Sequence, residues 1–275
     1  MEYIKKLFNL FHIFINKFLN QKKFYSQIGE DVIIYNNFIN KNLHNGTYIE
    51  IGGGDGYNSS NSKFFNKYLG FKGILIEPVP SFFEKLRKNR PKDILIKKAI
   101  DYNIGKSSFI GDSYTAGINS YLSKPLKEIY LSNAREFTVD TVPMSHIIET
   151  TNLDYIDYFS IDVEGAELVI LETMDWNIPV YVISIELNEK INETEQKDRN
   201  KNQKCRDILT KQGFTYVTRV DVNEFWVNQN YFRKDLLYDN NIKQFKTLDE
   251  AGKFLFLAEH VRKEVQDNLV LRENY

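Results

Sequence analysis

The sequence predicts an α/β fold in which a mostly parallel sheet carries helices on both faces. Two observations lead to this prediction. Short apolar runs have the length and composition of strands, at residues 46–51, 73–77, 94–100, 158–163, 180–187, 214–219 and 225–227. Helical patterns lie between several of them, at residues 81–89, 165–174 and 204–212. Strands that alternate with helices are typical of parallel sheets, because each parallel connection must cross a face of the sheet.

The composition is that of an ordinary soluble globular protein. The chain has 275 residues, with 42% hydrophobic and 27% charged residues, so it is long enough for one large α/β domain. A formal net charge of −1 argues against general nucleic-acid binding. The single cysteine, Cys205, excludes an intrachain disulfide and a Cys-rich zinc site. We expect a cytoplasmic protein.

Residues 1–23 predict an amphipathic N-terminal helix. Apolar side chains recur there at helical spacing, as Ile4, Leu7, Phe8, Phe11, Phe14, Ile15 and Phe18. The segment is too interrupted by polar residues to span a bilayer, and it lacks the pattern of a signal peptide. The helix could pack on the body of the protein, on a second subunit of a homo-oligomer, or on a membrane surface as a peripheral contact.

The main domain is expected over residues 24–230 and a C-terminal helical extension over 231–275. The extension contains a capping-box pattern at residues 247–250, followed by apolar residues at helical spacing. Within the main domain, residues 101–142 fit the strand–helix alternation poorly and predict an insertion or a long loop. Residues 188–204 are nearly all polar, which favours a solvated loop or a substrate lid.

A glycine-rich turn follows the first predicted strand. The pattern is E-x-G-x-G-x-G, from Glu50 to Gly56. Glycines allow positive φ angles and bring a ligand close to backbone N–H groups. The next strand ends in Glu77, and a glycine turn beside a terminal carboxylate is typical of a nucleoside-binding edge. The dinucleotide fingerprint G-x-G-x-x-G does not fit, because its last position falls on Tyr57 or Ser59.

Four motifs occur in order along the main domain. They are S-Q-x-G-E-D at residues 26–31, E-I-G-x-x-D-G-x-x-S-S-N at 50–61, L-I-E-P at 75–78 and I-D-V-E-G-A-E at 161–167. This set resembles the FkbM family of S-adenosyl-L-methionine (SAM) dependent methyltransferases, over roughly residues 24–230. Two departures are Glu50, where the family commonly has Asp, and Gly53-Gly54, where many members have a small residue and then Asn.

The resemblance implies a Rossmann-like class I methyltransferase fold with a seven-stranded sheet, and SAM as the cofactor. Glu77 is then expected to accept hydrogen bonds from the ribose hydroxyls, and Asp101 to reach the adenine amine. Gln27 and Glu30 would close over the methionine head, although residues 27–31 could instead cap the start of a helix. The expected cofactor-binding residues are Gln27, Glu30, Glu50, Gly52, Gly54, Gly56, Asn61, Glu77, Pro78 and Asp101.

The resemblance also implies O-methylation, and a sugar hydroxyl is a poor acid that needs a base or a metal ion. Asp162, Glu164 and Glu186 follow or end neighbouring strands, so we expect them to be catalytic. Three carboxylates would also suit Mg²⁺ or Mn²⁺. The alternative for Glu164, together with Glu167, is to cap the following helix. His146 is a second candidate base, or a structural histidine.

The favoured function is SAM-dependent O-methylation of a sugar hydroxyl on a glycan or glycoconjugate. Residues 109–121, which are rich in aromatic side chains, and residues 188–204 would then hold the acceptor. Two alternatives stay open at this point. One is methylation of a small secondary metabolite, and the other is a non-catalytic SAM- or glycan-binding subunit of a glycosylation assembly.

Overall fold

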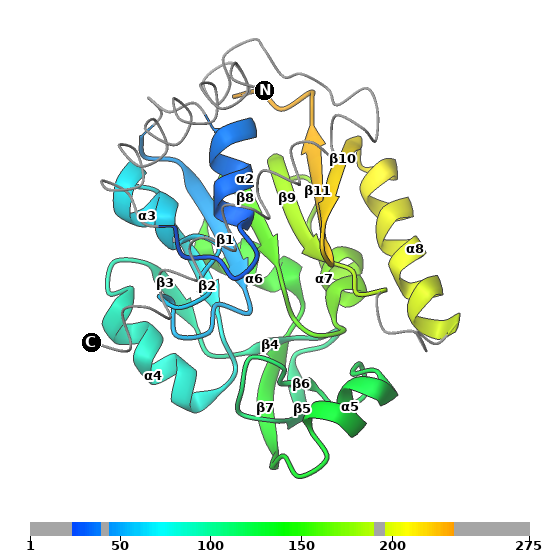
Figure 1. Ribbon diagram of the computed structural model, residues 1–275. Coiled ribbons are helices and arrows are strands. Elements are labelled where there is room, and N and C mark those ends of the chain that lie inside the picture. The colour runs from blue at the N-terminus through cyan, green and yellow to red at the C-terminus, as the bar shows by residue number, and fades with distance from the viewer. Residues whose placement is uncertain (1–23, 40–43, 190–195, 234–275) are drawn as a thin grey trace, which may run out of the picture.

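A seven-stranded sheet forms the centre of the protein (Figure 1). The computed structural model describes residues 24–39, 44–189 and 196–233. The strand order is β10-β11-β9-β8-β1-β2-β3. The bounds are β1 (Thr47–Ile51), β2 (Lys72–Ile76), β3 (Ile94–Ile96), β8 (Ile156–Ile161), β9 (Val180–Glu186), β10 (Phe214–Val220) and β11 (Asn223–Asn228).

The sheet is mostly parallel, as the sequence predicts. Strands β3, β2, β1, β8 and β9 pair in parallel with their neighbours. Strand β11 pairs antiparallel with both β9 and β10. The carboxyl ends of the five parallel strands therefore meet at one edge of the sheet, and side chains that follow these strands can be brought together there.

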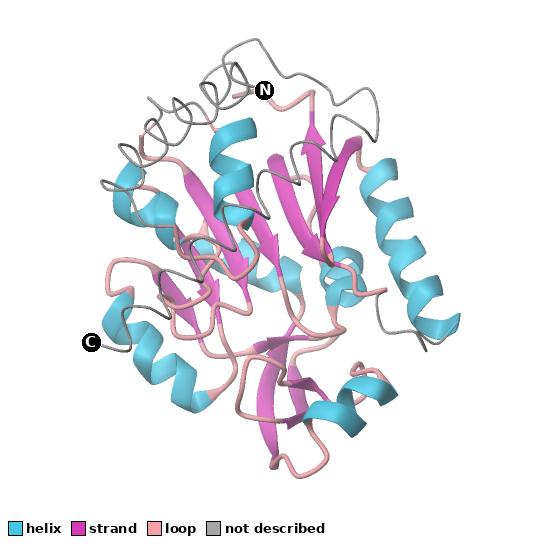
Figure 2. Cartoon of the chain, viewed as in Figure 1, coloured by secondary structure: helices cyan, strands magenta, loops and turns pink. Residues whose placement is uncertain are grey.

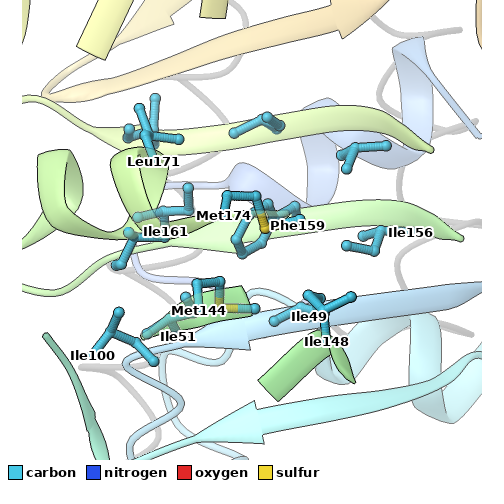
Figure 3. Close-up of a cluster of buried hydrophobic side chains, with 14 of the residues drawn as sticks. Ile49, Ile51, Ile100, Met144, Ile148, Ile156, Phe159, Ile161, Leu171 and Met174 are labelled. Atoms are coloured by element: carbon cyan, nitrogen blue, oxygen red, sulfur yellow. The ribbon is translucent and has the colours of Figure 1, made fainter. Parts of the chain in front are cut away.

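Helices cover both faces of the sheet (Figure 2). On one face lie α2 (Glu30–Asn37), α3 (Lys63–Leu69) and α4 (Pro80–Asn89), which contribute to one apolar cluster. On the other face lie α6 (Met144–Thr151), α7 (Glu167–Thr173) and α8 (Gln196–Lys211), which contribute to a second cluster. Figure 3 shows part of this second cluster, where Met144, Ile148 and Leu171 lie over Ile49 and Phe159. The predicted α/β architecture is confirmed.

Alternation along the strands explains the two clusters. In β1, Ile49 and Ile51 face the second cluster, whereas Tyr48 faces the first. In β8, Phe159 faces the second cluster and Tyr158 the first. Successive side chains of a strand point to opposite faces, so a strand that is covered on both sides is mostly apolar. This is why the central strands are continuous apolar runs in the sequence.

Residues 101–142, which the sequence predicts as an insertion or a long loop, form a small second sheet together with Ala99 and Ile100. Its strand order is β4-β7-β5-β6, and one helix accompanies it. The elements are β4 (Ala99–Ile100), β5 (Gly105–Ile110), β6 (Gly117–Ile118), α5 (Lys124–Tyr130) and β7 (Glu136–Val142). Two of these strands are only two residues long, too short for any apolar period to reveal them in the sequence.

Two other predicted bounds change. The predicted strand at residues 94–100 is divided into β3 and β4, which belong to different sheets. Helix α8 begins at Gln196, so the second half of the polar segment 188–204 is helical and not a loop. The N-terminal helix predicted at 1–23 and the extension beyond residue 233 lie outside the described residues. No helix among the described residues is long and apolar enough to cross a membrane.

Candidate active site

Two adjoining cavities lie at the carboxyl edge of the main sheet. The larger has a volume of about 210 Å³, and its walls come from the glycine-rich turn, the start of α4, the small sheet and the ends of β8 and β9. The smaller has a volume of about 50 Å³ and lies between α5, α7 and α8. Glu164 and Glu186 line both cavities. The two spaces therefore meet at carboxyl groups that the sequence singles out as catalytic.

The glycine-rich turn forms one wall of the larger cavity. Gly52 has a φ of 81°, and a Cβ there would lie 1.8 Å from the carbonyl oxygen of Asp162. Gly54 has a φ of 52°, and its Cβ would lie 2.9 Å from the ring of Tyr114. No side chain fits at either position, so the turn can pack against β8 and still leave space for a ligand. Gly56 does not line the cavity, because it packs against Leu86 of α4.

Glu77 lies at the centre of this wall and is 4% exposed. Its carboxylate accepts hydrogen bonds from the N–H of Gly54, at 2.8 Å, and of Val79, at 2.7 Å. Burial raises the pKa of Glu77 to about 7, although these two hydrogen bonds oppose the increase. Each carboxylate oxygen has a further lone pair, so both can also accept hydrogen bonds from a pair of ligand hydroxyls. Pro78 continues the wall beside it.

Glu50 lies behind this wall and does not line the larger cavity, contrary to the prediction that it binds the cofactor. Its carboxylate accepts hydrogen bonds from the Ser60 hydroxyl, at 2.9 Å, and from the N–H groups of Asn61, at 2.7 Å, and Ser62, at 3.2 Å. Asn61 also lies outside the lining, and its Nδ2 donates to the Ser160 hydroxyl at 2.9 Å. Both residues fix the loop after the glycine-rich turn.

Arg90 completes this support, although nothing in the sequence predicts this role. The side chain is 1% exposed and donates to the carbonyl of Gly56 at 3.2 Å, to the Ser60 hydroxyl at 3.1 Å and to Asp93 at 2.8 Å. A basic residue at the end of a helix is an ordinary favourable pairing with the helix dipole, so its sequence position carries no functional signal. Only the fold shows that Arg90 is buried beneath the turn.

Asp101 does not line the larger cavity, so the structure gives no support to the prediction that it contacts the adenine. Its carboxylate accepts hydrogen bonds from the hydroxyls of Tyr121 and Ser107, both at 2.6 Å. Tyr121 lines the smaller cavity, and Asp101 holds it in place. The predicted strand at 94–100 instead presents Lys98, Ala99 and Ile100 to the larger cavity.

Aromatic side chains form an apolar end of the larger cavity near Glu77. The rings of Phe82 and Tyr114 lie 4.8 Å apart, and Phe109 and Ile118 complete this end. The sequence predicts that the aromatic-rich segment 109–121 contacts the acceptor. The structure divides that segment, because Phe109, Tyr114 and Ile118 line the larger cavity and Tyr121 lines the smaller one.

Gln27 and Glu30 both line the larger cavity, as predicted for the motif at 26–31. Glu30 accepts hydrogen bonds from Asn223 Nδ2, at 2.8 Å, and from the Ile28 N–H, at 3.0 Å, and burial raises its pKa to about 7. The N-cap of α2 is Gly29, so no side chain caps this helix. Asp31 instead holds the segment before the helix, because it accepts from the N–H of Tyr25 at 2.6 Å. Asn223 begins β11, far along the chain, and sequence reasoning missed it.

Asp162, Glu164 and Glu186 converge, as predicted from their positions at the ends of β8 and β9. One carboxylate oxygen from each lies within 4.8 Å of the others. Burial and the neighbouring carboxylates raise the pKa of Glu164 to about 8. Burial also raises the pKa of Glu186, which is hydrogen-bonded to Asp162. Two carboxyl groups can share a hydrogen bond only if one of them carries a proton. Burial and repulsion by the neighbouring carboxylates favour the protonated form of Glu186, so Glu186 is the donor.

The helix-cap alternative applies to Glu167 and not to Glu164. Glu167 is the first residue of α7 and accepts a hydrogen bond from the Gly165 N–H at 2.8 Å. It also pairs with Lys201 of α8. Glu164 keeps its side chain at the cavities and has a φ of 53°. His146 lies on α6 and lines neither cavity, so the structure does not bring this second candidate base to the site.

The charge of the larger cavity suits a cationic nucleoside. Among the described residues that line it, the acidic ones are Glu30, Glu77, Asp162, Glu164 and Glu186, whereas Lys98 is the basic one. SAM carries a sulfonium and an ammonium group, together with a ribose diol and an adenine ring. The acidic lining, the carboxylate of Glu77, the apolar end at Phe82 and the glycine-rich turn each fit one of these parts.

One family model matches this chain. The model of the methyltransferase FkbM domain matches residues 50–216. The search of curated proteins found no match.

Similar solved structures include a Methanococcus jannaschii fibrillarin pre-rRNA processing protein, with 14% identity, 68% coverage of each chain and a TM-score of 0.39. An Aeropyrum pernix fibrillarin in complex with natively bound SAM has 10% identity, covers 67% of this chain and 66% of that chain, and gives a TM-score of 0.37. A TehB-like SAM-dependent methyltransferase from Corynebacterium glutamicum has 10% identity, 82% and 94% coverage, and a TM-score of 0.35. On the strength of the family match, which spans more than half of its length, the chain belongs to the FkbM family of SAM-dependent methyltransferases.

Proposed function

We propose that the protein methylates a hydroxyl group of a sugar, on a glycan or glycoconjugate. The observation that carries the proposal is the position of Glu164 and Glu186, which line both the larger cavity and the smaller one. A cofactor in the larger cavity and an acceptor in the smaller one would meet at these carboxyl groups. Methyl transfer depends mainly on such alignment of the two reactants.

The residues of the larger cavity are suited to hold SAM. Glu77 can accept from the ribose hydroxyls, while Gly52 and Gly54 leave room for the ligand beside the turn. Gln27 and Glu30 lie where the methionine head would be enclosed. When bound, SAM supplies an activated methyl group. Glu50, Asn61, Gly56 and Arg90 act from behind, by fixing the shape of the turn and of the loop that follows it.

The carboxyl cluster supplies the base that a sugar hydroxyl requires. A hydrogen bond from a protonated Glu186 would orient Asp162 and leave a free oxygen on the Asp162 carboxylate. That oxygen can accept the proton of an acceptor hydroxyl. Burial raises the pKa of Asp162, which makes it a stronger base than an ordinary aspartate.

A divalent cation is the alternative occupant of the same cluster. Three carboxylate oxygens within 4.8 Å of one another could ligate Mg²⁺ or Mn²⁺, which would stabilise a developing alkoxide directly. A bound cation would require all three groups to be ionised, whereas the base mechanism uses the shared proton. Removal of metal ions therefore separates the two mechanisms.

The lining of the smaller cavity supports a sugar as the acceptor. Ser123, Asn188, Asp198 and Lys201 offer hydrogen-bond donors and acceptors, while the ring of Tyr121 and Leu126 offer apolar surface. A sugar ring presents the same combination of hydroxyl groups and C–H faces. A flat, apolar secondary metabolite would match fewer of these polar groups.

Mass spectrometry with SAM that carries a trideuterated methyl group tests the proposal. The protein would be incubated with a panel of glycans and with a panel of phenolic and aliphatic alcohols. Transfer of the labelled methyl group to a glycan oxygen, with little transfer to the alcohols, is the expected result. Transfer to the alcohols alone would favour the secondary-metabolite alternative. Binding of SAM and glycan without any transfer would favour a non-catalytic subunit.

A further inference from the structure

A chain of contacts connects helix α8 to the loop that carries Glu164. Lys201 of α8 pairs with the carboxylate of Glu167, the first residue of α7. The other oxygen of Glu167 accepts a hydrogen bond from the N–H of Gly165 at 2.8 Å. The Glu167 side chain is 2% exposed and that of Lys201 is 21% exposed, so water screens this pair only weakly. Gly165 directly follows Glu164 in the chain.

The loop at 162–166 has a demanding conformation. Glu164 has a φ of 53° and Gly165 a φ of 116°, both in the left-handed region. A side chain other than hydrogen at Gly165 would lie 2.5 Å from the carbonyl oxygen of Tyr121, so the loop packs directly on the neighbouring segment. A left-handed glutamate is unfavourable by itself and needs support from its surroundings. The bond from Gly165 to Glu167 is part of that support.

Lys201 also determines the charge on the acceptor side. Among the described residues that line the smaller cavity, the acidic ones are Glu164, Glu167, Glu186 and Asp198, and Lys201 is the basic one. Without this ammonium group, Glu167 would be a buried and uncompensated carboxylate. Such a group is costly and tends to turn toward water or to take up a proton. Either change would weaken its hold on the Gly165 N–H.

We propose that Lys201 is a positioning residue for methyl transfer. It holds Glu167 in place, Glu167 holds the N–H of Gly165, and this contact fixes Glu164 where the two cavities meet. The proposal rests on the function proposed above, in which Glu164 acts on the acceptor side. Lys201 lines the smaller cavity and not the larger one, in which the cofactor is proposed to bind.

Two lysine variants and a matched control test this role. Lys201→Met removes the charge and keeps the length, whereas Lys201→Arg keeps a cation that can pair with Glu167. Lys204→Met is the control, because Lys204 is exposed on the same helix. Three quantities would be measured for each: hydrogen exchange of the backbone amides at 162–168, the dissociation constant of SAM, and the rate of methyl transfer.

Lys201→Met should accelerate exchange at 162–168 and lower turnover at least tenfold, which corresponds to about 1.4 kcal/mol. The dissociation constant of SAM should stay within about twofold of that of the unmodified protein. Lys201→Arg should restore both slow exchange and turnover, and Lys204→Met should match the unmodified protein. Unchanged exchange and turnover in Lys201→Met would overturn the proposal. So would a failure of Lys201→Arg to restore them.

Glu167→Gln provides a second variant in case Lys201→Met does not fold. The amide oxygen of Gln can still accept from Gly165, but it cannot form an ion pair with Lys201. We expect exchange at 162–168 that is faster than in the unmodified protein, and exchange equal to it would contradict the proposal. The exchange measurement requires no acceptor. It therefore tests the contacts from Lys201 through Glu167 to Gly165 even if the unmodified protein transfers no methyl group. A lack of transfer by the unmodified protein would refute the proposed function and not this chain of contacts.

Discussion

Glu77 and Gly54 are joined by a 2.8 Å hydrogen bond, although they lie 23 residues apart in the sequence. The bond connects the carboxylate expected at the ribose to the turn expected beside the methionine part of the cofactor. The sequence predicts both features separately, but it does not predict their contact. Because of this bond, Glu77 has two roles, as a ligand for the cofactor and as a support for the turn.

Replacement of Glu77 should therefore weaken cofactor binding strongly. Glu77→Ala removes the hydrogen-bond acceptor and releases the Gly54 N–H, so the affinity for SAM should fall at least tenfold, or about 1.4 kcal/mol. Isothermal titration calorimetry measures this change. Glu84→Gln serves as the control, because Glu84 is exposed on α4 and should leave the affinity unchanged. An unaltered affinity in folded Glu77→Ala would show that the ribose does not bind there.

Glu77 should also make the stability of the ligand-free protein depend on pH. Its pKa is about 7 in the folded protein, compared with an ordinary value of 4.5. A raised pKa means that the folded state holds the proton more tightly, so this stabilisation is complete below pH 4.5 and disappears as the pH rises through 7. The melting temperature should fall between pH 5 and pH 8. Glu77→Gln should reduce the slope, and an identical slope would contradict the assigned pKa.

Asp162 should be needed for turnover more than for cofactor binding. Asp162→Asn keeps the size of the side chain but removes the base, so SAM should still bind while the rate falls by ~10²–10⁴-fold. The rate would be followed by release of S-adenosylhomocysteine in the presence of acceptor. Asp140→Asn is a suitable control, because Asp140 is an exposed partner of Lys106 on the small sheet. Near-normal turnover of Asp162→Asn would make this residue structural.

Metal dependence distinguishes the two mechanisms available to the carboxyl cluster. If Asp162, Glu164 and Glu186 hold a divalent cation, EDTA should abolish activity, and Mg²⁺ or Mn²⁺ should restore it. If the cluster acts as a base, activity should persist in EDTA, and added Mg²⁺ or Mn²⁺ should not increase it. Rates measured in chelator, with and without added metal, decide between them.

The predicted N-terminal helix should mediate association. Its apolar side chains would otherwise form an exposed patch, which soluble monomers avoid. A subunit contact predicts a mass above that of the monomer in light scattering, and a membrane contact predicts co-sedimentation with liposomes. Either property should be lost when residues 1–20 are deleted. If the full-length protein is monomeric and does not co-sediment with liposomes, both the subunit contact and the membrane contact are refuted.

Much of the fold was predictable because its central strands carry a simple signal. The strands that are covered on both faces are mostly apolar, and all appear as runs in the sequence. The small sheet was not predictable, because β4 and β6 are two residues long and β4 is stabilised by pairing with residues far away in the chain. Strand pairing of this kind depends on the tertiary structure and not on local sequence.

The site divides in a similar way. Asp162 and Glu186 were predictable as neighbours, because the ends of adjacent parallel strands meet at one edge. Glu50 was misplaced because it lies within β1 and not at the end, so its side chain reaches the loop behind the turn. Arg90 and Lys201 belong to helical segments whose charged residues have the sequence pattern of a solvent-exposed face. Only the packing of the folded protein shows where these two side chains lie.

A crystal structure with S-adenosylhomocysteine would test directly whether the cofactor binds in the larger cavity. We expect the nucleoside to occupy this cavity, with its ribose hydroxyls within hydrogen-bond distance of Glu77 and its adenine at the aromatic end beside Phe82. We also expect the sulfur to face Asp162, on the side where the smaller cavity begins. A ligand bound elsewhere, or a ribose that makes no contact with Glu77, would contradict the account.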